Sequence, residues 1–309
     1  MQSRWLDVRL ISLCVLLSGV VWLLGMSAIG SPTPAAQYGR PPLVLHETRE
    51  TPLDLEIAGD LVGLAPGSVR YLKRADLRTF PPATFLVRND PNFVAPTRVS
   101  GVELMALLRK VSGHPQTDMV VAVCSDGYHA NYRHSYVEAH SPLLALLLDN
   151  NPPKDWPKDS ETHQRDIGPF LISHPDFQPA YKVLGQDEVA QIPWGVVRLE
   201  FRDEATVYGP IAPQGPHASD PDVQDGFRIA QQDCFRCHNS GPEGGQKAQR
   251  PWTVLASWAA ASPDHFTAYV QNPKAVNANA QMPGNPGFDD ATLHALTAYF
   301  RTFAEAGKR

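Results

Sequence analysis

The chain has 309 residues, of which 43% are hydrophobic and 19% are charged, values that are ordinary for a soluble globular protein and allow two domains. Its formal net charge is -5 and it has no basic block, which argues against nucleic acid as a partner. It contains four cysteines, two of them in one short motif, which excludes a disulfide scaffold.

The first 30 residues have the plan of an export signal. Arg4 and Arg9 precede an uncharged apolar run over residues 10–29. The run approaches the roughly 20 residues that cross a bilayer, so a cleaved signal peptide and a retained anchor both stay open. We therefore expect a periplasmic protein, either soluble after cleavage or associated with the inner membrane through this run. A proline-rich tether over residues 31–50 follows.

Residues 51–204 have the pattern of a mixed α+β domain. Apolar residues spaced i, i+3, i+4 and i+7 predict a helix over residues 104–111, with Ser100 and Glu103 as a capping box before it. The apolar run 141–148 predicts a second helical piece. Short β-rich runs predict strands at residues 53–57, 84–87, 119–123, 169–173 and 196–201.

Two pieces of this domain, VSGVELMALL at residues 99–108 and VVAVCSDGY at residues 120–128, resemble the sulfite-oxidase-type molybdopterin-binding domain. Later runs similar to the family follow in the same order, at residues 143–149, 168–172 and 196–201. In that family the cysteine that ligates molybdenum typically lies upstream of the first piece, and here that part of the domain contains none. The resemblance therefore implies the fold without its usual metal ligand.

Cys124 lies in the second piece, which does not match the family's ligand position. Because it ends an apolar run, we expect a buried small side chain. A reactive thiol and a molybdenum ligand are the alternatives.

The C-terminal domain is expected over residues 220–309, after a linker of prolines and glycines at residues 205–219. Cys234, Cys237 and His238 form the C-x-x-C-H pattern of covalent haem c attachment. Two thiols at this spacing can add to the two vinyl groups of one porphyrin, and the next residue's imidazole can reach the iron. A thioredoxin-like pair would need a β-α-β setting and a zinc site a second Cys/His pair, and the sequence offers neither.

Helices are expected on both sides of this motif. An aspartate at 220 or 222 caps a helix that runs into Cys234. Residues 262–264 start another helix, which Pro273 ends. A last helix carries an apolar face made of Leu293, Leu296, Phe300 and Phe303.

The sixth iron ligand is expected from Met282, in the loop before the last helix, with His265 and His294 as alternatives. This arrangement resembles class I cytochromes c across residues 220–303, which implies an all-α domain with one covalent haem c. The resemblance also implies that the carbonyl of Pro251 accepts a hydrogen bond from the proximal imidazole.

The leading functional prediction is an exported electron carrier with a His/Met-ligated haem. The α+β domain would serve as a docking or scaffold module toward a dehydrogenase or a terminal oxidase, and no catalytic residue is assigned. A molybdenum-dependent oxidoreductase that passes substrate electrons to its own cytochrome domain is the alternative. A third possibility, haem-based sensing, requires an open distal site.

Overall fold

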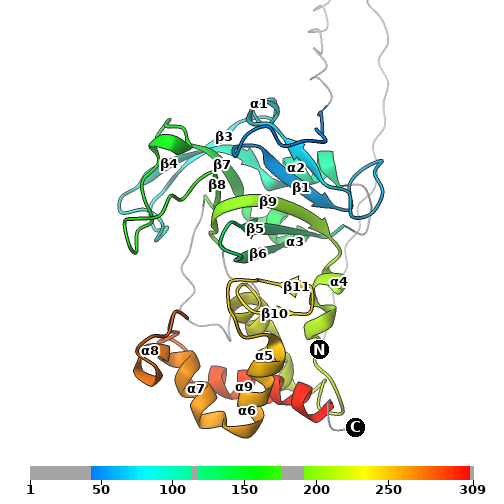
Figure 1. The fold of residues 1–309 in the computed structure, drawn as a ribbon, viewed down its shortest axis with the longest axis vertical. Helices are drawn as coiled ribbons and strands as arrows, with labels where there is room; N and C mark the ends of the chain where they lie inside the picture. Colours follow the sequence, from blue (N-terminus) through cyan, green and yellow to red (C-terminus); the bar gives the residue numbers. More distant parts are fainter. Residues whose placement is uncertain (1–42, 113–116, 176–190, 307–309) are drawn as a thin grey trace, which may run out of the picture. The chain divides into compact units, whose positions relative to one another are not determined.

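A mixed α/β N-terminal part is followed by a helical C-terminal region (Figure 1). The computed structural model describes residues 43–112, 117–175 and 191–306. The predicted signal or anchor at residues 1–30 and most of the predicted tether lie outside these ranges. Within them, no helix combines the length and the apolar character needed to cross a bilayer.

The N-terminal part is built on a nine-stranded sheet. Seven strands follow the order β2-β1-β9-β8-β7-β4-β3, and β5 pairs with both β9 and β6. The β1–β9 pair is parallel and the other strand pairs are antiparallel. The strands are β1 (Leu55–Gly59), β2 (Arg70–Leu72), β3 (Ala83–Val87), β4 (Thr97–Glu103), β5 (Met119–Cys124), β6 (His129–Arg133), β7 (Leu143–Leu148), β8 (Phe170–Ser173) and β9 (Trp194–Arg202).

The helix predicted over residues 104–111 is confirmed as α2 (Leu104–Val111), but its capping box is wrong. Ser100 lies within β4, opposite Leu147 of β7, and its hydroxyl accepts a hydrogen bond from Thr84. The Ser100 side chain therefore takes part in a cross-strand hydrogen bond, and the N-cap of α2 is Glu103. The other short helices here are α1 (Arg74–Leu77), α3 (His134–His140) and the 3-10 turn η1 (Pro153–Asp155).

The second helix predicted, over residues 141–148, is wrong. Residues 143–148 form strand β7, and the helix that precedes it, α3, ends at His140. Five of the six side chains of β7 are buried, because β7 lies inside the sheet between β4 and β8. A strand buried on both faces has a continuous apolar sequence, which resembles that of a buried helix.

The C-terminal region is helical, as the sequence predicts. The chain enters it through α4 (Glu204–Tyr208) and the 3-10 turn η3 (Gly209–Ile211), in the segment predicted as a linker. A small hairpin of β10 (Asn239–Ser240) and β11 (Glu243–Gly244) separates the first two long helices. The remaining elements are α5 (Pro221–Ile229), the π-helical turn η4 (Ala230–Cys234), α6 (Trp252–Ala261), α7 (Pro263–Gln271), α8 (Pro273–Val276) and α9 (Asp290–Ala306).

The core of the C-terminal region extends into the sheet. The described residues between 43 and 306 belong to one compact unit. One buried apolar cluster, which we call the C-terminal core, combines Trp252, Phe235 and Phe300 with Met119 and Val121 of β5. Two side chains of the N-terminal sheet therefore belong to the same apolar core as the C-terminal helices.

Candidate haem site

The motif lies where α5 widens into a π-helical turn. The N–H of Phe235 donates to the carbonyl oxygen of Ala230 at 2.9 Å, and the N–H of His238 donates to that of Cys234, also at 2.9 Å. These turns place the two thiols and the imidazole within one short stretch. π-Helical turns are rare in proteins, and those that do occur are often found at functional sites.

The imidazole of His238 is oriented by a backbone carbonyl. Its Nδ1 lies 2.6 Å from the carbonyl oxygen of Arg250. Burial lowers the pKa of His238, which favours the neutral ring. A neutral imidazole that donates from Nδ1 keeps the lone pair of Nε2 for a metal, an arrangement common in metal-binding histidines.

The prediction that Pro251 supplies this carbonyl is wrong by one residue. Pro251 is the N-cap of α6, and its carbonyl oxygen accepts from the N–H of Val254 at 2.9 Å. The first turn of the helix therefore uses that acceptor. The preceding carbonyl, that of Arg250, stays free for the imidazole.

Both thiols of the motif are unpaired and partly buried. Burial raises the pKa of Cys234 and of Cys237, so the sulfurs are held as thiols. Two free thiols beside an oriented imidazole are the donor set that covalent haem attachment needs. These residues therefore fit haem c.

Of the three candidate sixth ligands, Met282 has the most suitable surroundings. It is partly buried and packs against the C-terminal core, as does Cys234. His294 is 70% exposed and lies 3.2 Å from the carboxylate of Asp222. The ring of His265 packs edge-on against Trp258, with centroids 5.3 Å apart.

Aromatic rings surround the motif from inside the C-terminal core. Phe235, between the two cysteines, packs edge-on against Trp252 with centroids 5.5 Å apart. Trp252 contacts Phe300 of α9, with centroids 4.9 Å apart. The predicted aromatic face of the last helix is thus confirmed as a packing surface behind the haem motif.

The sequence did not reveal that the N-terminal sheet holds the haem motif directly. The tip of the β5–β6 hairpin meets the loop around the motif through two backbone hydrogen bonds: His129 N–H to the carbonyl of Arg236 at 2.8 Å, and Gln246 N–H to the carbonyl of Gly127 at 2.7 Å. The Asp-Gly pair at residues 126–127 signals a hairpin turn. Its partner lies more than a hundred residues away, which no local pattern reports.

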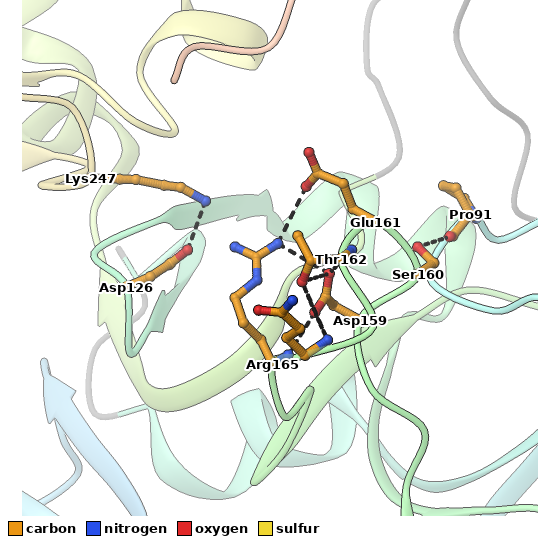
Figure 2. A network of polar contacts seen from close by, with 9 residues as sticks. Pro91, Asp126, Asp159, Ser160, Glu161, Thr162, Arg165 and Lys247 are labelled. Atoms are coloured by element: carbon orange, nitrogen blue, oxygen red, sulfur yellow. Dashed lines mark hydrogen bonds and ion pairs between the residues drawn. The ribbon is translucent and has the colours of Figure 1, made fainter. Parts of the chain in front are cut away.

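An ion pair strengthens the same contact. Figure 2 shows the ammonium of Lys247 directed at the carboxylate of Asp126, at 2.7 Å. The neighbouring loop is held by the carboxylate of Asp159, which accepts hydrogen bonds from the backbone and side chain of both Thr162 and Arg165. These bonds lower the pKa of Asp159 despite its desolvation. Side-chain hydrogen bonds to Asp159 therefore fix the conformation of this loop.

Cys124 is buried, as predicted. It is 4% exposed and belongs to the core between the sheet and α2. Burial raises the pKa of its thiol, so the side chain is held as a thiol in this structure. Within the described ranges, no group of three or more His, Cys, Asp or Glu side chains is arranged to hold a metal ion.

Comparison with known families agrees with this geometry. Residues 221–300 match the family of cytochrome c oxidase, cbb3-type, subunit III. The C-terminal region is a cytochrome c domain. This domain carries the C-x-x-C-H motif, and the family match ends within α9.

Comparisons beyond the C-terminal region give only weak similarity. Comparison with curated proteins gives no match. Among solved structures, the sulfane dehydrogenase SoxCD from Paracoccus pantotrophus is similar at 14% identity and a TM-score of 0.33, over 56% of this chain and 45% of that chain. The match thus spans less than half of the SoxCD chain, and a similarity this low does not establish a shared fold.

Proposed function

We propose that the protein is an exported electron carrier whose cytochrome c domain binds one haem c through Cys234 and Cys237, with His238 and Met282 as axial ligands. The observation that carries this proposal is the hydrogen bond from His238 Nδ1 to the carbonyl of Arg250, beside two free thiols. It leaves Nε2 available for iron.

Haem c, when bound, supplies a one-electron Fe(III)/Fe(II) couple. The protein's residues set the conditions for that couple. His238 is held in one orientation by a backbone acceptor, and aromatic side chains such as Phe235 and Trp252 exclude water from the core behind the motif. A thioether ligand from Met282 favours a comparatively high reduction potential. One electron then arrives from a donor protein and leaves to an acceptor protein, such as a dehydrogenase and a terminal oxidase.

The N-terminal part is proposed as the scaffold of this carrier, with a sulfite-oxidase-type fold. The hairpin tip at residues 125–128 holds the loop that follows the haem motif, which supports a structural role. The sequence resemblance at residues 99–108 and 120–128 favours the alternative, a molybdenum oxidoreductase. The side chain of Cys124 is 4% exposed and packs within the core between the sheet and α2, which supports the scaffold over that alternative.

The experiment that tests the proposal is a metal and haem count on purified full-length protein. We expect about one iron and no molybdenum per chain, with haem that stays on the polypeptide in a denaturing gel. The double variant Cys234→Ser/Cys237→Ser should lose the gel-stable haem, while Cys124→Ser, the matched control at the remaining described cysteine, should keep it. Stoichiometric molybdenum that is lost in Cys124→Ser would establish the enzyme instead.

Export through residues 1–30 is part of the proposal. Cell fractionation and N-terminal sequencing of the purified protein test it. A mature N-terminus within or after residues 28–36 would indicate cleavage, and an intact N-terminus in the membrane fraction would indicate an anchor. A cytoplasmic protein without haem would contradict export and haem attachment together.

A further inference from the structure

Arg250 occupies an unusual position, because its backbone and its side chain are both tied to the candidate site. Its carbonyl oxygen orients the imidazole of His238. The following residue is Pro251, which restricts residue 250 to extended conformations and so limits the directions its carbonyl can take. The resemblance to cytochromes c does not explain an arginine here.

The guanidinium of Arg250 is stacked on aromatic rings of two helices. Its central carbon lies 4.8 Å from the ring centroid of Trp258 in α6 and 5.6 Å from that of Tyr269 in α7. Both distances are within the range of a cation–π interaction. The two rings also pack edge-on against each other, with centroids 5.6 Å apart. The cation therefore sits on a prearranged aromatic surface.

Among the described residues, no carboxylate forms an ion pair with Arg250. In the part of the chain that the structure describes, its guanidinium contacts aromatic faces rather than a carboxylate. An aromatic partner holds a cation in place without cancelling its charge. A permanent positive charge is thus fixed on the residue that accepts the hydrogen bond of the proximal imidazole.

We propose that Arg250 is a positioning residue that sets the reduction potential of the site. Its stacked side chain fixes the carbonyl that orients His238, and its uncompensated charge favours the reduced state. This inference rests on the proposed function. A fixed cation near a redox centre disfavours the more positive oxidised state, and the effect grows as the local dielectric falls.

The test is a set of variants in the full-length haem protein, compared by spectroelectrochemical titration. Arg250→Gln should lower the midpoint potential, and Arg250→Lys should restore most of it because it returns the charge. Trp258→Leu removes the stacking partner, so the potential should fall and become dependent on salt, since a cation released into solvent is screened. Arg301→Gln, which removes an exposed cation from α9 of the same domain, is the matched control.

The outcomes separate this inference from the proposed function. A potential in Arg250→Gln that shifts no more than in Arg301→Gln would overturn the role of Arg250, while the haem carrier would stand. Equal lowering in Arg250→Lys and Arg250→Gln would also overturn it, because a general loss of structure would then be the cause. If Arg250→Gln takes up no haem, the Trp258→Leu variant provides the test instead. A midpoint potential in Trp258→Leu that is unchanged and independent of salt would then overturn the role of Arg250. Absence of haem from the unaltered protein would reject both proposals.

Discussion

The backbone N–H of His129 donates to the carbonyl oxygen of Arg236, the residue just before the second cysteine of the haem motif, at 2.8 Å. This bond joins strand β6 of the N-terminal sheet to the candidate haem site. A second bond, from Gln246 N–H to Gly127, lies on the other side of the hairpin tip. The sheet and the haem loop are therefore joined at this point. Substitutions at the hairpin tip should alter the stability of the loop around the haem motif.

Gly127→Ala should weaken this contact. Gly127 has a φ of +82°, and a Cβ there would lie 2.9 Å from the carbonyl carbon of Gln246 and 3.0 Å from the nitrogen of Lys247. Backbone strain costs about 1–2 kcal/mol and displacement of the loop adds about 1–3 kcal/mol. Gly67→Ala is the control, because φ is +79° and no atom lies within 4 Å of its added Cβ. Equal losses of unfolding free energy in the two variants would show that the loop contact contributes nothing.

Gly226→Ala should destabilise the cytochrome domain, although alanine favours helices. A Cβ at this position of α5 would overlap the carbonyl oxygen of Ala295 in α9. The gain in helix propensity is about 1 kcal/mol, whereas moving two packed backbones apart costs about 1–3 kcal/mol or more. Thermal unfolding followed by haem absorbance measures the balance. Gly209→Ala, with no atom within 4 Å of the added Cβ, should leave the midpoint nearly unchanged, and a stabilised Gly226→Ala would contradict the close helix contact.

Met282→Ala should abolish the six-coordinate low-spin spectrum of the haem protein at neutral pH. The substitution removes the thioether while leaving the thiols and His238 in place. Met282→His should restore six-coordination with a bis-histidine signature. His294→Ala is the control, because this exposed ring is paired with Asp222 and should be dispensable. An unchanged spectrum in Met282→Ala would contradict Met282 as the sixth ligand and would favour a histidine.

Asp90 should make the stability of the N-terminal part depend on pH. Burial raises its pKa from 3.8 to about 6, although the N–H of Asn92 and the hydroxyl of Ser173 both donate to it. The folded state then holds its proton more tightly than the unfolded chain, so the contribution of Asp90 to stability is fully present below about pH 4 and is lost as pH rises through about 6. The difference in pKa corresponds to about 3 kcal/mol.

Urea unfolding of the wild type and Asp90→Asn between pH 4 and 7 checks this effect. The loss of stability over that range should be smaller in Asp90→Asn by up to the same amount. Asp155→Asn, at an exposed aspartate, should follow the wild type. Parallel curves for wild type and Asp90→Asn would contradict the raised pKa.

Local chemistry explains what the sequence could predict. The C-x-x-C-H motif, the helix after Ser262 and the aromatic face of α9 each depend on residues within about one or two turns of one another. The helix predicted over residues 141–148 is wrong because residues 143–148 form a strand buried on both faces, and such a strand has no alternation of apolar and polar residues to reveal it. The prediction of Pro251 as the acceptor is wrong because the choice between adjacent carbonyls depends on where α6 begins.

Non-local contacts account for the rest. The contact of residues 125–128 with residues 236–247 joins segments on different elements through backbone groups, which every sequence possesses. The stacking of Arg250 on Trp258 and Tyr269 likewise requires the packing of α6 against α7. Neither leaves a periodic signal in the sequence.

The position of the sheet in the chain has a consequence for assembly. Strand β9 ends at Arg202, so every strand of the nine-stranded sheet is synthesised before Cys234. Domains generally fold in the order in which they are made. When the loop around the haem motif is made, the sheet that contacts it through Gly127 and His129 can already be folded. The order of synthesis would then set the order of sheet folding and haem attachment.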